Sequence, residues 1–188
     1  MLRRTKFFRP AAPQDLVVRP RLIDKLNDGL RRPLTLVAAP AGYGKTMLAS
    51  SFLQSCALPW AWLSLDEHDD DLRLFLEYLL TALDSMFPGS LQRTQLILTG
   101  STLPPVSAIA DSLVNELAEL ERPFILVLDD IHVIHAADAY RLLAALLRYP
   151  PHGMHLMLLT RQDPPMGLGV LRARDQMSEI RARDLRFT

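Results

Sequence analysis

A short segment between an apolar run and a helix-like stretch constrains this chain most. Residues 34–38 read Leu-Thr-Leu-Val-Ala, the next eight read Ala-Pro-Ala-Gly-Tyr-Gly-Lys-Thr, and residues 47–53 are all small or apolar. A strand, a turn of small residues ending in Gly-Lys-Thr and then a helix is the phosphate-binding loop, or P-loop, here with alanine in place of its usual first glycine. Such a pattern arises by chance in on the order of 1% of chains of this length, so an ordinary glycine-containing turn is a weak alternative.

The chemistry of phosphate binding explains the residue types in this loop. Small residues allow consecutive backbone N–H groups to point into one concavity, and the N-terminus of the following helix adds a partial positive charge. We expect Lys45 to place its charge on the β- and γ-phosphates and the Thr46 hydroxyl to coordinate Mg²⁺. The predicted ligands are therefore ATP or ADP with Mg²⁺. The predicted nucleotide-binding residues of the loop are Ala39, Pro40, Ala41, Gly42, Tyr43, Gly44, Lys45 and Thr46.

Composition limits the other functions open to the chain. The 188 residues carry 21 basic and 21 acidic side chains and a formal net charge of zero, whereas direct nucleic-acid binding needs a dense basic surface. The single cysteine, Cys56, excludes an internal disulfide and fits a reducing cytoplasm. No apolar run approaches the ~20 residues of a membrane span, and no apolar segment of a signal peptide follows the N-terminal arginines. We therefore expect a cytoplasmic location, no membrane contact and no direct DNA binding.

Apolar runs alternate with helical patterns along the rest of the chain. Residues 1–20 form an arm rich in proline and basic residues, and residues 21–188 are expected to form one P-loop nucleotide-binding domain. Runs typical of buried strands occur at 34–38, 60–65, 124–128, 155–160 and 178–182. Apolar residues at helical spacing predict helices near 21–30, 47–53, 72–83, 106–117 and 136–148, a helical turn at 171–176 and a short helical piece within the loop 88–105. This alternation indicates an α/β fold with a parallel sheet and right-handed crossovers.

Two more strands end in polar side chains that suit a P-loop protein. The apolar run 124–128 is followed by Asp129 and Asp130, the arrangement of a Walker B strand. We expect Asp129 to hold Mg²⁺ and Asp130 to orient or deprotonate the attacking water, with a role as a helix-capping or turn residue for the segment starting at Ile131 as the alternative for Asp130. The run 155–160 is followed by Arg161, whose fixed charge suits a γ-phosphate sensor, although solvated arginines at strand ends are common. The predicted catalytic residues are Lys45, Asp130 and Arg161, and the predicted metal ligands are Thr46 and Asp129.

Other polar clusters give weaker signals. The acidic segment 66–71 lacks the spacing of a calcium-binding loop, and Asp69 to Asp71 are expected to cap the helix that follows. His132 lies two residues after the acidic pair, and we expect a structural role for it. The five histidines show no metal-ligand spacing with the cysteine.

Several motifs together resemble one protein family. They lie at Thr5 to Pro10, 16–22, 40–46, 62–66, 128–132, 171–176 and 184–188. In these motifs the chain resembles the large ATP-dependent LuxR-type transcriptional regulators, which belong to the signal-transduction ATPases with numerous domains (STAND). The resemblance runs almost from end to end. It implies a P-loop three-layer sandwich with a five-stranded, mainly parallel sheet in the order 5-1-4-3-2, Arg161 as sensor 1, and Val18 and Arg19 near the adenine.

The same resemblance implies a function. In that family ATP or ADP sets an assembled or a resting state, which implies a regulatory switch that hydrolyses ATP slowly at most and self-associates in the full-length regulator. The family's winged-helix, repeat and helix-turn-helix domains lie outside these 188 residues, so we expect neither inducer recognition nor specific DNA binding from this segment.

Two other functions remain as alternatives. A small stand-alone P-loop enzyme, such as a nucleoside or metabolite kinase, would need an arginine-rich lid, for which Arg73 and Arg93 are the candidates between the two Walker segments. An interaction module whose P-loop no longer binds nucleotide is disfavoured because Lys45, Thr46 and Asp129 are all present.

Overall fold

Five parallel strands form the single sheet of this domain in a computed structural model that describes residues 2–11 and 19–186. The strands are β1 (Leu34–Ala38), β2 (Trp60–Ser64), β3 (Phe124–Asp129), β4 (Met154–Thr160) and β5 (Met177–Arg181). Their order is β2-β3-β4-β1-β5, and all four neighbouring pairs are parallel. This is the predicted order 5-1-4-3-2 read from the other edge, so the fold prediction is confirmed.

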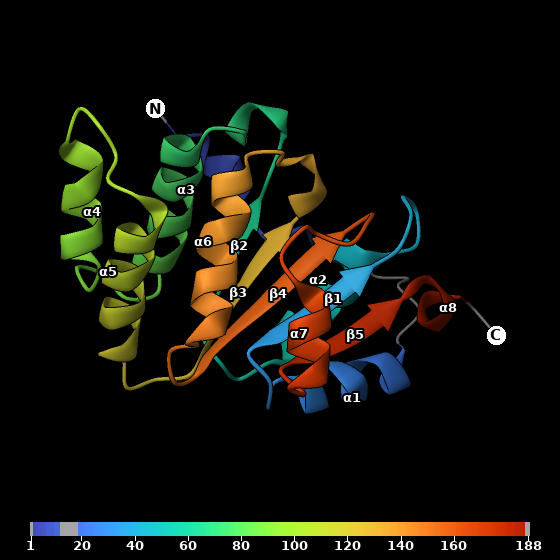
Figure 1. The fold of residues 1–188 in the computed structure, drawn as a ribbon. Helices are drawn as coiled ribbons and strands as arrows, with labels where there is room; N and C mark the ends of the chain where they lie inside the picture. The colour runs from blue at the N-terminus through green and yellow to red at the C-terminus, as the bar shows by residue number, and fades with distance from the viewer. Residues whose placement is uncertain (1, 12–18, 187–188) are drawn as a thin grey trace.

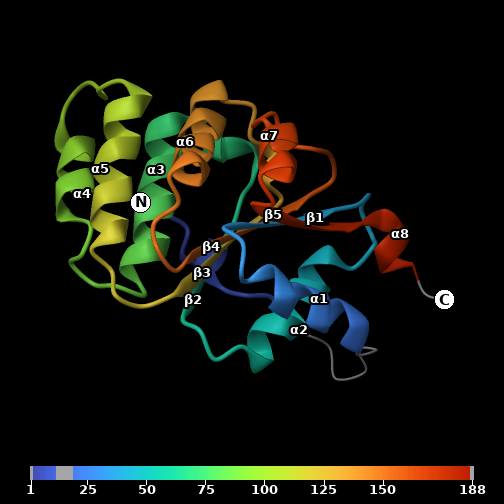
Figure 2. The same cartoon turned by 60° about the horizontal axis from the view of Figure 1, so that its bottom comes forward.

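Helices cover both faces of the sheet and give three layers (Figures 1 and 2). One face is covered by α1 (Pro20–Gly29) and α2 (Lys45–Ser55). The opposite layer contains α3 (Leu72–Asp84), α4 (Gln92–Thr99), α5 (Val106–Ala118), α6 (Ala137–Arg148) and α7 (Leu168–Ala173). The short α8 (Ala182–Leu185) follows β5, and three 3₁₀ turns are η1 (Arg4–Phe7), η2 (Glu67–Asp69) and η3 (Ile131–Val133).

Burial on both faces explains why the central strands are almost entirely apolar. Every residue of β3 and β4 is buried. Successive side chains point to opposite faces of a strand, so Leu126 and Leu158 enter the core beneath α3 to α7, whereas Val127 and Met157 enter the core beneath α1 and α2. Parallel strands covered by helices on both faces lose the polar alternation of a half-exposed sheet. The arrangement brings the carboxyl ends of β1, β3 and β4 to one edge.

The helices predicted from apolar spacing are present, with small shifts at their ends. The predicted short helix within 88–105 is α4. The predicted helical turn at 171–176 begins earlier, at Leu168, where Gly167 in the left-handed conformation (φ 70°) precedes α7. Because Leu168 and Leu171 are both buried, this earlier start places a second apolar side chain of α7 in the core.

The acidic segment 66–71 only partly follows its prediction. Asp71 caps α3, since its side chain accepts a hydrogen bond from a backbone N–H in the first turn of that helix at 3.0 Å. Asp69 is instead buried at 1% exposure, with Lys6 Nζ 2.6 Å from its Oδ1. Asp70 accepts hydrogen bonds from two backbone N–H groups just before α6. The capping prediction was therefore wrong for Asp69 and Asp70, because the 3₁₀ turn η2 directs them away from α3.

The described part of the N-terminal arm lies against the domain. Its prolines predicted irregular structure, yet Arg4–Phe7 forms the turn η1 beside β2. Lys6, 7% exposed, bonds to Asp69 and also to Asp66, whose Oδ2 lies 2.8 Å from Nζ. Two carboxylates offset the loss of hydration of one buried ammonium, which explains how this lysine is accommodated. Within residues 2–11 and 19–186, no helix has the length and apolar character needed to cross a membrane.

Candidate nucleotide site

The loop between β1 and α2 depends on two glycines with positive φ. Gly42 has φ 80° and Gly44 has φ 78°, a region that glycine adopts without steric penalty. A Cβ atom at either position would meet nothing within 4 Å. The requirement for glycine therefore comes from backbone conformation, and the space beside both residues is open.

Lys45 is a buried cation held by its own loop. Lys45 is 6% exposed, and its Nζ donates hydrogen bonds to Ala39 O at 2.8 Å and to Pro40 O at 3.0 Å. Burial is the main cause that lowers the pKa of Lys45, and the charge of Arg161 lowers it further. Two neutral carbonyl groups thus solvate a charge that an anion would compensate better.

Thr46, in the first turn of α2, contacts Asp129 at the carboxyl end of β3. The Thr46 hydroxyl donates to the Asp129 carboxylate, with distances of 3.2 and 3.1 Å to its two oxygens. Burial, followed by the nearby charge of Asp130, raises the pKa of Asp129 to about 6. An ionised carboxylate at this position is electrostatically unfavourable, and a bound cation would reverse that effect.

The Thr46 and Asp129 side chains suit Mg²⁺ that is bound together with phosphate and water, rather than a metal ion held by protein side chains alone. Hydroxyl and carboxylate oxygens are the donors that Mg²⁺ prefers, and this ion usually takes one or two protein ligands, with water and phosphate completing its shell. The described residues contain no group of three or more His, Cys, Asp or Glu side chains able to hold a metal. The donor set of Thr46 and Asp129 therefore suits a metal that arrives with a phosphate ligand.

Asp130 has an unusual backbone conformation directly after the Walker B strand. Its φ of 57° and ψ of 34° are left-handed, a region in which aspartate is enriched among non-glycine residues. Its side chain makes no capping hydrogen bond to the turn η3 that follows, which counts against the capping alternative. Asp130 Oδ1 lies 3.7 Å from Nδ1 of His132, and the Asp130 side chain is 44% exposed. The carboxylate is thus accessible to solvent beside Asp129.

The other predicted site residues have different environments. Arg161 directly follows β4, is exposed, and makes no hydrogen bond or ion pair in the described part of the chain. Its charge nevertheless lowers the pKa of both Lys45 and His132, after the larger effect of burial in each case. Val18 lies outside the described residues. Arg19 precedes α1, where its Nη1 donates to Leu185 O at 2.6 Å, so the proximity of this segment to an adenine stays a prediction.

The two arginines considered for a kinase lid are engaged at α4. Arg73 donates to Leu98 O and, at 2.9 Å, to Gly100 O, while Arg93 pairs with Glu119. In Figure 1, α4 lies at the far end of the helical layer from α7 and β1. Neither side chain is therefore available as a lid over the P-loop in this structure.

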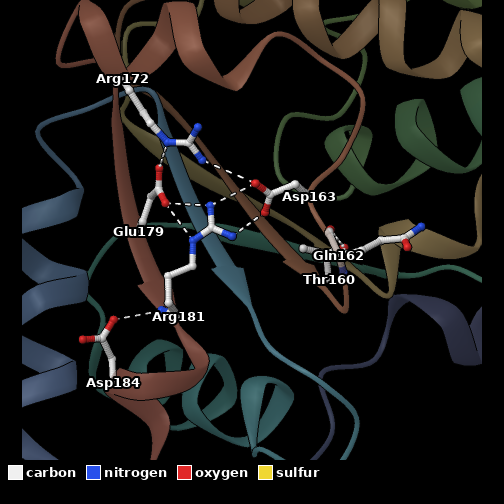
Figure 3. Close-up of polar contacts among 7 residues, drawn as sticks. All are labelled: Thr160, Gln162, Asp163, Arg172, Glu179, Arg181 and Asp184. Carbon is white, nitrogen blue, oxygen red and sulfur yellow. Dashed lines mark hydrogen bonds and ion pairs between the residues drawn. The ribbon is translucent and has the colours of Figure 1, made fainter.

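Sequence reasoning missed an ion-pair cluster next to Arg161. Figure 3 shows Asp163, Arg172, Glu179 and Arg181 in mutual contact between the loop after β4, α7 and β5. Glu179 and Arg181 alternate along β5, a pattern visible in the sequence. Nothing in the sequence indicates that their partners are Asp163 and Arg172.

Comparisons with known proteins agree with this geometry. A family model described as "AAA ATPase domain" matches residues 16–159. Two proteins named "HTH-type transcriptional regulator MalT", from Serratia proteamaculans and Klebsiella pneumoniae, are 36% and 35% identical over all of this chain, and the chain spans 21% of their length. Similarity to transcriptional regulators, expected from the motifs, is thereby confirmed.

Two solved structures share the fold at low sequence identity. Cdc6p from Pyrobaculum aerophilum aligns with a TM-score of 0.60 and 16% identity over 96% of this chain and 49% of its own. The Aeropyrum pernix ORC1 protein, solved in complex with DNA, aligns with a TM-score of 0.52 and 18% identity over 86% of this chain and 42% of its own.

Proposed function

Because the chain belongs to the AAA ATPase domain family, we propose that it is the ATP- or ADP-controlled switch domain of a signal-responsive transcriptional regulator. The observation that carries this proposal is the meeting of Lys45, Thr46 and Asp129 at the carboxyl ends of β1 and β3. The regulator context is supported by the 36% identity to a protein named for transcriptional regulation. DNA binding is not assigned to this segment, and self-association is proposed for the full-length regulator.

Each residue of the site has a separate role in this proposal. The P-loop backbone and Lys45 bind the phosphates, and Lys45 exchanges its bonds to Ala39 and Pro40 for phosphate oxygens. Thr46 and Asp129 would hold Mg²⁺, which supplies positive charge to the phosphate oxygens when bound. Arg161 senses the γ-phosphate from the end of β4, since its guanidinium is unpaired among the described residues.

Binding is tested by thermal unfolding of the isolated chain. At about 100 times its dissociation constant, a ligand adds about 2.7 kcal/mol of stability, which for a domain of this size is a rise in Tm of roughly 5–10 °C. We expect that rise with millimolar ATP or ADP plus Mg²⁺ and no comparable rise with Mg²⁺ alone. If neither ATP nor ADP raised the Tm, an autonomous nucleotide site would be contradicted.

Slow hydrolysis is tested at Asp130. Changing Asp130 to asparagine keeps the shape but removes the charge that orients or deprotonates water, so we expect hydrolysis to fall by about 100-fold while ATP affinity changes little. Single-turnover measurements with the protein in excess over ATP suit a slow rate. Asp138→Asn, which alters an exposed carboxylate on α6, is the control. An unchanged rate in Asp130→Asn would exclude Asp130 from the chemistry.

A further inference from the structure

Four side chains of alternating charge form a closed ring of ion pairs beside the loop that carries Arg161. They belong to Asp163, Arg172, Glu179 and Arg181. Arg181 bonds to Asp163 through Nη1, and its Nε donates to Glu179 at 2.7 Å. Arg172 bonds to Glu179 through Nε and reaches Asp163 at 3.4 Å. Each residue therefore contacts both residues of opposite charge, as Figure 3 shows. The four formal charges sum to zero, so the ring fixes geometry without creating a charged patch.

Burial and charge pairing make these contacts more than chance surface pairs. The side chains of Glu179 and Arg181 are 23% and 27% exposed, whereas those of Arg172 and Asp163 are 45% and 48% exposed. The hydrogen bond from Arg181 is the main cause that holds the pKa of Asp163 below its ordinary value. For Glu179, burial alone would raise the pKa, but hydrogen bonds from Arg172 and Arg181 bring it below the ordinary range. Both carboxylates thus remain charged at neutral pH and keep their partners.

Arg161 lies between two fixed points of the backbone. On its amino side, Thr160 O accepts a hydrogen bond from Ala39 N at 3.2 Å, which ties the end of β4 to the start of the P-loop. On its carboxyl side, Asp163 is held by the ring. Residues 161–163 are themselves exposed, and the loop is next buried at Pro164. Apolar packing therefore does not hold residues 161–163. The Thr160 hydroxyl donates to Gln162 O at 2.6 Å and accepts from Gln162 N at 3.3 Å, and the ion pair of Asp163 is the next anchor along the loop.

Arg181 connects this loop to the P-loop strand. It is the last residue of β5 and pairs in register with Ala38, the last residue of β1. Its guanidinium therefore ties the Arg161 loop to β5, the neighbour of the strand that leads directly into the phosphate-binding residues. A displacement of residues 161–163 would move Arg161 relative to Lys45, to which its charge already couples.

We propose that Asp163 and Arg181 are positioning residues for Arg161 and thereby set the preference of the site for a nucleoside triphosphate over a diphosphate. The proposal rests on the proposed nucleotide site. Arg161 contacts the additional phosphate in the triphosphate, so fixing its loop affects the triphosphate more than the diphosphate. The ring contributes little to global stability, because solvent screens partly exposed ion pairs.

The test compares ATP and ADP dissociation constants of the complete chain, measured by titration with Mg²⁺ present. Asp163→Asn and Arg181→Met should each reduce the ADP-to-ATP ratio of dissociation constants by roughly 3- to 30-fold, the range for coupling between sites. Arg161→Ala should reduce this ratio at least as much. Arg32→Met is the matched control, because Arg32 forms a partly exposed ion pair with Asp175 at the opposite end of the sheet. It should leave the ratio unchanged.

A double-variant cycle distinguishes positioning from a direct effect. If Asp163 acts through Arg161, then Asp163→Asn should not alter the ratio further in an Arg161→Ala background. A further loss there would overturn the proposal, as would an unchanged ratio in Arg161→Ala or in both ring variants. Failure of the unaltered chain to bind either nucleotide would instead contradict the proposed function itself, and this proposal with it. Melting temperatures of all variants verify that each remains folded.

Discussion

Replacing Lys45 with methionine is expected to weaken ATP and ADP binding by about 30-fold or more, since truncating a buried charge partner costs about 2 kcal/mol or more. The site loses the cation that lies between the P-loop carbonyls of Ala39 and Pro40. Methionine retains the apolar stem of this residue, which is 6% exposed, so no large cavity is left. Isothermal titration with Mg²⁺ present measures the effect.

The stability of this variant separates loss of binding from loss of folding. Because burial lowers the pKa of Lys45, its charged form is disfavoured in the ligand-free domain, and its removal should not lower the free energy of unfolding. Lys25→Met is the matched control, since Lys25 is a partly exposed lysine of α1 that is paired with Asp184 and has no phosphate contact in the proposed site. Equal loss of affinity in both variants would refute a specific role for Lys45.

The sequence predicted those features that depend on neighbouring residues. The P-loop is a contiguous segment whose backbone conformation requires Gly42 and Gly44, so it can be recognised from the sequence alone. Asp129 was predictable because an entirely apolar run must be a strand buried on both faces, and the first carboxylate after it must lie at the edge of the sheet. The order of the strands came from the family resemblance.

Contacts between distant segments were not predictable in the same way. Lys6 and Asp69 are separated by 63 positions, and neither lies in a pattern that selects the other as its partner. Arg181 and Asp163 likewise come from a strand and a loop that meet only after the sheet has formed. Asp69 to Asp71 form a run of identical residues, yet they have different partners because Asp69 ends the η2 turn, Asp70 follows it and Asp71 is the N-cap of α3.

The charges of Lys45 and Asp129 are each electrostatically unfavourable in the ligand-free domain. Burial disfavours the charged forms of both Lys45 and Asp129, although each would contact an opposite charge in the proposed complex. A nucleotide with Mg²⁺ supplies an anion to the lysine and a cation to the carboxylate. The domain is thus expected to release electrostatic strain on binding, which couples nucleotide occupancy to stability.

Changing Asp129 to asparagine should therefore stabilise the ligand-free domain while removing most of the Mg²⁺ dependence of ATP binding. The folded-state pKa of Asp129, about 6, lies above its ordinary value of 3.8. The ionised carboxylate therefore destabilises the fold fully above pH 6, and this destabilisation fades as the pH falls towards 4. At pH 7.5 we expect the asparagine variant to be more stable by about 1–3 kcal/mol, since each pKa unit corresponds to about 1.4 kcal/mol.

The difference in unfolding free energy between variant and parent isolates this effect. His155, 2% exposed, has a pKa lowered to about 4 by burial, so it destabilises the fold as the pH falls from 6.5 to 4, the opposite direction. That contribution is common to both proteins and cancels in the difference, which should stay level from pH 7.5 to about pH 6 and shrink from there to pH 4. Asp111→Asn, at an exposed position of α5, should show no such trend. A difference independent of pH, or a less stable asparagine variant at pH 7.5, would mean that Asp129 is not electrostatically strained in the ligand-free site.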